Sequence, residues 1–241
     1  MEQVLASHPA FVTTEEASPL PQCFIKAKDA IGRPVGVPVD LPDLSVVERN
    51  RMREHFVAIG REVTGNSLTD RILVDKLPLN LAELGVANWL FPDGKAIVAL
   101  RDPRDAVLSC YMQHFQINTA MMQFLDLERS AKIYALVMDI WLHYREILTM
   151  QWVEYRYEDL VADFEGTVRK ILDFAGPGWH DAVNSYAERA KQIRVATPSY
   201  AAVIQPINSR AVSRWRNYRE QLAPILPILA PYVEKFGYDP D

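Results

Sequence analysis

The sequence predicts an α/β protein with a mostly parallel β-sheet. Short apolar runs rich in β-branched residues alternate along the chain with longer segments that carry apolar residues at helical spacing, and this alternation is typical of a parallel sheet covered by helices. The sequence contains neither internal repeats nor low-complexity tracts. The length of 241 residues allows one large domain or two small ones, and we expect a single domain over residues 1–241.

Three segments are expected to form strands. The runs RILVDK (71–76) and KAIVALR (95–101) are apolar and end in a basic residue, which is typical of buried strands. The run WVEYRYEDL (152–160) predicts a strand that continues into a turn. Ligands bind at the carboxyl ends of the strands in such sheets, so the residues that end these runs are candidates for a binding site.

Helices are expected at 1–7, 45–61, 80–91, 102–115, 127–148, 164–174, about 180–192 and about 221–236. The segment 102–115 has the clearest helix start, because Asp102 stands at the N-cap and Pro103 at the first helical position. Residues 17–45 are proline-rich and weakly periodic, which predicts a surface loop and a candidate lid or substrate rim. The segment 196–208 is expected to be irregular.

The composition argues against several classes of protein. The net charge is −5, which disfavours a general nucleic-acid binder, and no stretch approaches the ~20 apolar residues of a membrane span. Cys23 and Cys110 are not at metal-ligand spacing and the five histidines form no paired motif, so we expect reduced thiols and no metal. The N-terminus lacks signal-peptide features, which predicts a cytoplasmic protein. No heptad or interface stripe predicts an oligomeric state.

Two cations stand at the ends of expected strands. Lys76 follows RILVD and Arg101 follows KAIVAL, so both are expected at the edge of the sheet where ligands bind. Arg101 is followed by a helix N-terminus, and Ser109 lies about two turns further along that helix. A guanidinium, a helix N-terminus and a hydroxyl together would form a phosphate cradle. The alternative is that Arg101 is paired with Asp102 or Asp105.

Two further segments carry candidate functional side chains. Glu15 and Glu16 follow the first helix, where a carboxylate acts either as a general base or as surface charge. The tail holds four arginines around Trp215 and Tyr218 in a chain that is otherwise acidic. Such a segment either closes over an anionic aromatic ligand such as a nucleotide, or forms a solvated face with Trp215 in the core.

The order of several motifs resembles the sulfotransferase superfamily. The segments DKLPLN, FPDGKAIVALRDPRDAVLSCY, RYEDL and PINSRAVSRWRNY follow one another as in this family, and the resemblance runs from EQVLASHP to SRWRNY. The most similar branch comprises the tyrosylprotein sulfotransferases and the bacterial sulfotransferases linked to tetratricopeptide repeats. The resemblance implies a P-loop-like three-layer α/β/α fold and 3′-phosphoadenosine 5′-phosphosulfate as sulfuryl donor, without a metal.

The resemblance also implies residues that bind the donor. Arg101 and Ser109 match the pair that holds the 3′-phosphate in the family. Tyr157, in RYEDL, matches a tyrosine that contacts the donor. Ser199 and Arg214 match residues of the tail that close on the donor near its sulfate and phosphates.

The resemblance implies two catalytic residues. Lys76 matches the lysine beside the transferring sulfuryl group, which neutralises charge on the leaving oxygen. Glu16, in HPAFVTTEE, matches the glutamate that takes the proton from the acceptor hydroxyl. The chain departs from some members at Gln113, where they carry a further phosphate-binding arginine, and this predicts a weaker hold on the 3′-phosphate.

The family places a strand and a Pro-Arg-Ser-Gly-Thr loop directly before the helix that contains EQVLASHP. We therefore expect that this chain lacks its first strand and 5′-phosphosulfate loop, and that the reading frame begins upstream of Met1. The expected acceptor is a hydroxyl of a protein tyrosine, a sugar, a lipid or a small alcohol. Two alternatives stay open: an inactive remnant that serves as a binding module, and a P-loop nucleotide kinase, although RDPRDAVLS and SRWRNY favour the sulfotransferase.

Overall fold

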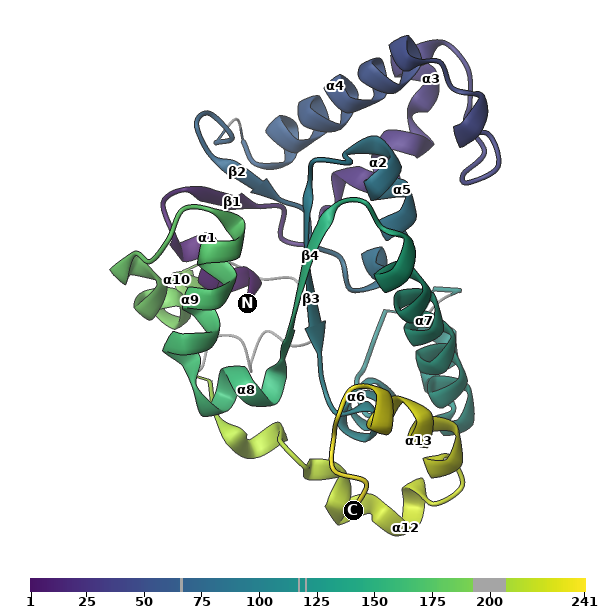
Figure 1. Ribbon diagram of the computed structural model, residues 1–241, viewed down its shortest axis with the longest axis vertical. Coiled ribbons are helices and arrows are strands. Elements are labelled where there is room, and N and C mark those ends of the chain that lie inside the picture. The colour runs from purple at the N-terminus through teal and green to yellow at the C-terminus, as the bar shows by residue number, and fades with distance from the viewer. Residues whose placement is uncertain (66, 117, 120, 193–206) are drawn as a thin grey trace. The chain divides into compact units, whose positions relative to one another are not determined.

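The computed structural model describes residues 1–65, 67–116, 118–119, 121–192 and 207–241 (Figure 1). The chain forms two compact units. Unit 1 contains the described residues of Met1–Ala96, Leu148–Trp152 and Leu172–Val195, and unit 2 those of Ile97–Ile147, Val153–Ile171 and Ala196–Asp241. Each unit is described by itself below. The single domain expected over residues 1–241 stays a prediction.

Unit 1 contains a short parallel strand pair and several helices. Strand β1 (Phe11–Thr13) pairs with β2 (Ile72–Val74), in a register that sets Phe11 opposite Ile72 and Thr13 opposite Val74. The helices are α1 (Glu2–Ser7), α2 (Pro19–Ile25), α3 (Ala27–Ile31), α4 (Val46–Val63), α5 (Leu84–Leu90) and α10 (Tyr186–Gln192), with 3-10 turns at Leu41–Asp43, Pro78–Leu81 and Asp181–Ser185.

The main apolar core of unit 1 lies under α4. Its buried members are Leu20, Cys23, Phe24, Ala27, Leu41, Leu44, Met52, Ile59, Val86 and Leu90. The Cys23 thiol is free and donates a hydrogen bond to the carbonyl of Met52 at 3.2 Å. Gly60 lets α4 pass close to β2, since a Cβ there would clash with the Leu73 side chain.

Unit 2 is mainly helical. Its helices are α6 (Pro103–Tyr111), α7 (Leu127–Ile147), α8 (Tyr157–Ala162), most of α9 (Phe164–Ala175), α12 (Arg219–Leu222) and α13 (Leu226–Lys235), with 3-10 turns at Met121–Leu125, Ser209–Ala211 and Arg214–Tyr218. Its core joins the tail residues Trp215, Leu222, Ile225 and Leu229 to Val107, Leu108 and Ala131 of α6 and α7. Strands β3 (Lys95–Leu100) and β4 (Gln151–Arg156) pair with each other, and the boundary between the units passes through both.

The α/β class is confirmed, and most of the expected elements are present. The expected strands appear as β2, β3 and β4, and the expected N-cap is present because Asp102 accepts a hydrogen bond from the Arg104 amide at 2.9 Å. Burial was overestimated for β2, where Ile72 is 43% exposed. In β3, burial alternates along the strand instead of being continuous.

The expectation of a loop over 17–45 was wrong, because this segment contains α2 and α3. Pro19 is compatible with the helix since it occupies the first helical position, where its missing N–H costs nothing. Leu20, Cys23 and Phe24 then lie on the face that packs into the core. The sequence pattern is weak because this helix has only seven residues.

Several boundaries also differ from expectation. The segment 80–91 is split into a 3-10 turn and α5, and 221–236 is interrupted before α13 at Pro224, which cannot donate a helical hydrogen bond. After β4 the chain forms α8 instead of a turn. Strand β1 was not expected at all.

Among the described residues, no helix is both long and apolar enough to cross a lipid bilayer.

We expect Ser45→Ala to destabilise the protein by about 1 kcal/mol, because Ser45 forms a capping box at the start of α4. Its hydroxyl accepts a hydrogen bond from the Glu48 amide at 3.2 Å, and its own amide donates to the Glu48 carboxylate at 2.9 Å. The bonds from Ser45, together with Arg33, lower the pKa of Glu48 to about 2. Urea denaturation measures the loss. The exposed Ser67→Ala is the control, and an equal loss in both variants would contradict the capping role.

Candidate active site

The carboxyl ends of β1 and β2 meet because the two strands are parallel. Hydrogen bonds tie the loops that follow them: the Thr14 amide donates to the Val74 carbonyl at 3.2 Å, and the Lys76 amide to the Thr14 hydroxyl at 3.4 Å. Asp75 accepts the amide of Leu20 at 3.0 Å, which fixes the second loop to the start of α2. The backbone around Lys76 is therefore held by both strands and by a helix.

Lys76 and Glu16 form an ion pair at this edge. Lys76 Nζ lies 2.5 Å from Glu16 Oε1 and 2.9 Å from Oε2 of Glu2, the first residue of α1. The side chains of Lys76 and Glu16 are 34% and 30% exposed, whereas that of Glu2 is 13% exposed. The structure thus brings the two expected catalytic residues together, with partial access to solvent, and adds a third, more buried carboxylate that the sequence analysis missed.

The backbone at Glu15 and Glu16 is in the left-handed region, with φ of 49° and 73°. For residues other than glycine this conformation costs of order 1–3 kcal/mol and is enriched at functional sites. Glu15 faces a different cation, since its Oε1 lies 3.9 Å from Nη2 of Arg189 on α10. The two adjacent carboxylates are thereby separated, and Glu16 is the one directed to Lys76.

Arg101 lies directly after β3, in unit 2. Its Nη2 donates a hydrogen bond to the Ala211 carbonyl at 2.7 Å, and its guanidinium carbon lies 5.2 Å from the centroid of the Tyr157 ring. The Nε atom of Arg101 is buried and has no hydrogen-bond partner among the described residues. A buried donor of this kind is costly unless it is satisfied, and an anionic ligand would satisfy it.

Neither carboxylate proposed as an alternative partner of Arg101 forms an ion pair with it within the described part of the chain. Asp102 is bound by Arg104, whose Nη2 lies 2.7 Å from Oδ2 and whose Nε donates to Oδ1 at 3.0 Å. Asp105 Oδ1 accepts the amide of Trp215 at 2.7 Å. These contacts leave the charge of Arg101 available to a ligand.

The other residues expected to bind the donor are Ser109, Tyr157, Arg214 and Ser199. Ser109 is half-buried on α6, and the neighbouring Cys110 has a pKa raised by burial and lowered in part by Arg101, which places Arg101 near this stretch of the helix. The Tyr157 hydroxyl donates to the Asn208 carbonyl at 3.4 Å. Arg214 contacts the Met112 sulfur at 3.4 Å. Ser199 lies outside the described residues.

The tail adopts the alternative arrangement at Trp215. Its side chain is 1% exposed in the core of unit 2, and the Arg104 guanidinium stacks 3.8 Å from its ring centroid. Arg104 also donates to the carbonyls of Asp239 and Pro240, at 2.6 and 2.9 Å. Arg104 therefore joins the start of α6, the tail and the C-terminus. The sequence did not predict this structural role of Arg104.

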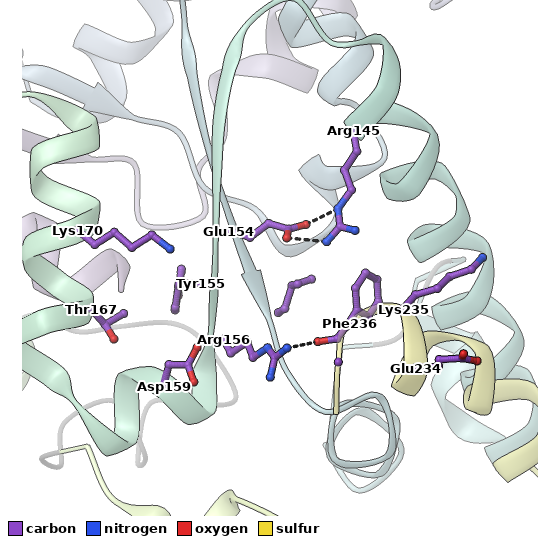
Figure 2. Close-up of a pocket in the computed structure, with 12 residues that line it drawn as sticks. Arg145, Glu154, Tyr155, Arg156, Asp159, Thr167, Lys170, Glu234, Lys235 and Phe236 are labelled. Atoms are coloured by element: carbon purple, nitrogen blue, oxygen red, sulfur yellow. Dashed lines mark hydrogen bonds and ion pairs between the residues drawn. The ribbon is translucent and has the colours of Figure 1, made fainter. Parts of the chain in front are cut away.

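A separate cavity of ≈ 430 Å³ lies in unit 2 and contains none of the seven expected site residues (Figure 2). Its lining residues are Leu100, Arg145, Glu154, Tyr155, Arg156, Asp159, Thr167, Lys170, Glu234, Lys235, Phe236 and Gly237. Arg145 is bound by Glu154 through two hydrogen bonds of 2.7 and 2.6 Å, and Arg156 donates to the Phe236 carbonyl. The residues expected to be functional that the structure describes lie outside this cavity. Within the described part of the chain, no three His, Cys, Asp or Glu side chains form a group able to hold a metal ion.

Comparison with known proteins gives one family. A sequence model described as the sulfotransferase family matches residues 1–181. A protein-tyrosine sulfotransferase of Drosophila melanogaster is 29% identical over 182 residues, which cover 70% of this chain and 35% of that protein. Protein-tyrosine sulfotransferase 2 of Gallus gallus is 27% identical over 188 residues, which cover 70% of this chain and 47% of that protein.

Two further similarities concern length and fold. An uncharacterized protein of Aquifex aeolicus (strain VF5) is 29% identical over 170 residues, which cover 70% of this chain and 22% of that protein. The chain thus spans about a fifth to a half of the length of these curated relatives. The sulfotransferase domain from the curacin biosynthetic pathway matches 99% of this chain and 92% of its own, with a TM-score of 0.67 and 16% identity, which is a likeness of fold.

We expect Asp105→Asn to change how stability depends on pH. Burial raises the pKa of Asp105, and the hydrogen bond from Trp215 and the charge of Arg101 oppose this only in part. The folded protein then retains a proton that the unfolded chain releases, so the contribution of Asp105 to the free energy of unfolding falls as the pH rises from about 4 through the raised pKa.

In Asp105→Asn, this fall of the free energy of unfolding with rising pH should be absent. Urea denaturation from about pH 3 to about pH 8 measures the difference between the variant and the wild type. Asp173→Asn, at an exposed position of α9, is the control for the loss of one carboxylate. If the wild-type and Asp105→Asn curves stay parallel, the raised pKa is contradicted.

Proposed function

The chain belongs to the sulfotransferase family, and we propose that it transfers a sulfuryl group from 3′-phosphoadenosine 5′-phosphosulfate to an acceptor hydroxyl. The observation that carries the proposal is the ion pair of Lys76 and Glu16, 2.5 Å apart, at the joined carboxyl ends of β1 and β2. A carboxylate that takes a proton and a cation that stabilises a leaving oxygen are what sulfuryl transfer requires of a protein, as phosphoryl transfer does.

In the proposed reaction, Glu16 accepts the proton of the acceptor hydroxyl as that oxygen bonds to sulfur. Lys76 stabilises the negative charge on the phosphate oxygen whose bond to sulfur breaks. The donor, when bound, supplies the sulfuryl group and the leaving phosphate. The residues present need no metal for this step, since a cation and hydrogen-bond donors stabilise the same charge.

We assign the donor's 3′-phosphate to Arg101 and Ser109, and a further contact with the donor to Tyr157. Arg101 fits an anion because its Nε has no partner among the described residues, and Tyr157 already stacks against the same guanidinium. Arg214 and Ser199 are assigned to the closing tail. Arg214 supports this role through its place beside α6, whereas Ser199 is assigned from the family resemblance alone.

We propose a protein tyrosine as the first acceptor to test. The support is that relatives from Drosophila melanogaster and Gallus gallus are protein-tyrosine sulfotransferases. The direct experiment supplies a labelled sulfuryl donor to the protein, with tyrosine peptides, sugars and small alcohols as separate acceptors. Binding of the donor without transfer to any acceptor would favour the inactive binding module. Transfer from ATP in preference to the sulfuryl donor would favour the nucleotide kinase.

Arg101→Ala should weaken binding of 3′-phosphoadenosine 5′-phosphate by about 10- to 100-fold, because a charge-assisted hydrogen bond contributes about 1.5–3 kcal/mol. The affinity of the variant for AMP, which lacks the 3′-phosphate, should fall much less. Calorimetric titration of both ligands measures the difference, and Arg129→Ala, at an exposed position of α7, is the control. Equal losses for the two ligands would refute the assignment of Arg101 to the 3′-phosphate.

Glu16→Gln should lower kcat by about 10²- to 10⁴-fold, the usual contribution of a general base, while the affinity for the donor stays within about twofold. Steady-state kinetics and donor titration check the two parts separately. Glu15→Gln is the matched control, since Glu15 is adjacent but faces Arg189. If Glu15→Gln causes the larger loss of kcat, the base is Glu15 and the assignment to Glu16 is wrong.

A further inference from the structure

Glu2 occupies a fixed place beside the candidate active site. It is the first residue of α1, whose Val4 and Leu5 are 1% and 2% exposed in the core of unit 1. The neighbouring Gln3 accepts a hydrogen bond from Arg189 of α10 at 3.3 Å, and Ser7 closes the helix through a bond to the Gln3 carbonyl at 2.8 Å. The backbone that carries the Glu2 side chain is therefore anchored on both sides.

The Lys76 ammonium contacts two carboxylates of unequal exposure. Nζ lies 2.5 Å from Glu16, whose side chain is 30% exposed, and 2.9 Å from Glu2, whose side chain is 13% exposed. An ammonium group has three donors, so these two contacts leave one donor for a ligand oxygen. The second oxygen of Glu2, Oε1, is buried and has no partner among the described residues, so the contact with Lys76 is the main one that Glu2 makes.

The charges around Lys76 come from four segments of unit 1. Glu2 comes from α1, Glu15 and Glu16 from the loop after β1, Lys76 itself from the loop after β2, and Arg189 from α10. Arg189 is directed to Glu15, at 3.9 Å. Within the described ranges, Lys76 is the cation that the structure places within 4 Å of Glu2.

The ionisation of Glu2 depends on this neighbourhood. Burial raises its pKa, Lys76 opposes the rise, and the negative charges of Glu16 and Glu15 add to it. A buried carboxylate paired with a cation contributes little net stability, because desolvation offsets the attraction. Stability alone therefore does not account for a glutamate at this position.

We propose that Glu2 is a positioning residue for Lys76. Glu2 holds the Nζ atom of Lys76 in place when Glu16 takes up the proton of the acceptor. This inference rests on the roles proposed above for Glu16 and Lys76. Once Glu16 is protonated, its contact with Lys76 changes from an ion pair to a weaker hydrogen bond between the ammonium and a neutral carboxyl group. Glu2 contacts the same ammonium and is the more buried of the two carboxylates, so it holds the ammonium where the leaving oxygen needs it.

The test compares Glu2→Gln with two other variants of the protein. Glu2→Gln keeps the shape and removes the charge, whereas Glu2→Asp keeps a carboxylate that is shorter by one methylene group. Glu62→Gln, at an exposed position of α4, is the matched control. The first readout is the ammonium resonance of Lys76 in ¹H–¹⁵N spectra, assigned by its loss in Lys76→Met. The second is kcat together with the KM for the donor.

The expected result has two parts. The Lys76 resonance shifts or broadens in Glu2→Gln and not in Glu62→Gln, and kcat falls about 10-fold or more in Glu2→Gln while the KM stays within about twofold. Glu2→Asp should recover part of the loss, and it carries the test if Glu2→Gln does not fold. A purely structural role would not separate kcat from KM in a variant with wild-type thermal stability.

Other results overturn the inference or the function separately. An unchanged Lys76 resonance in Glu2→Gln, or an unchanged kcat, overturns the positioning role. A wild-type protein that transfers sulfuryl groups to no acceptor overturns the proposed function instead. In that case the Lys76 resonance alone decides whether Glu2 holds the ammonium.

Discussion

The parallel pairing of β1 with β2 is the interaction on which the candidate active site depends. The strands have only three residues each, yet their register sets Thr13 opposite Val74 and brings both carboxyl ends to one edge. Glu16 and Lys76 follow within three residues of these ends and meet there. A shift of register by one residue would turn the side chains of a strand to the opposite face. The hydrogen bond from the Lys76 amide to the Thr14 hydroxyl fixes this register beyond the strands themselves.

The two groups of charged residues differ in how completely they are compensated. At Lys76, carboxylates outnumber the cation, which suits a site where one carboxylate gains a proton during the reaction. After β3, both carboxylates have partners: Asp102 is paired with Arg104, and Asp105 accepts a hydrogen bond from the Trp215 amide. Arg101 has a buried N–H group without a hydrogen-bond partner among the described residues. That arrangement suits an anion. The strained backbone at Glu16 adds a local cost, which the packing of the surrounding helices must offset.

Features that depend on neighbouring residues can be predicted from the amino-acid sequence. The α/β class followed from the alternation of apolar runs and helical segments, and Asp102 with Pro103 set the start of α6 because capping needs only adjacent groups. Lys76 and Arg101 were candidates because each directly follows an apolar run, and such a position can be recognised in the sequence alone. The role of Glu16 came from the family resemblance, because a lone carboxylate in a loop carries no local sign of its partner.

Features that depend on residues far apart in the chain become apparent in the folded structure. Residues 19–31 are helical because Leu20, Cys23 and Phe24 gain a core to pack against, although their proline content suggests a loop. Strand β1 exists because β2 supplies its hydrogen bonds, some sixty residues further along the chain. Glu2 and Lys76 meet for the same reason. Local propensity is weak over so few residues, and the burial and pairing energies that override it act between segments that are far apart in the sequence.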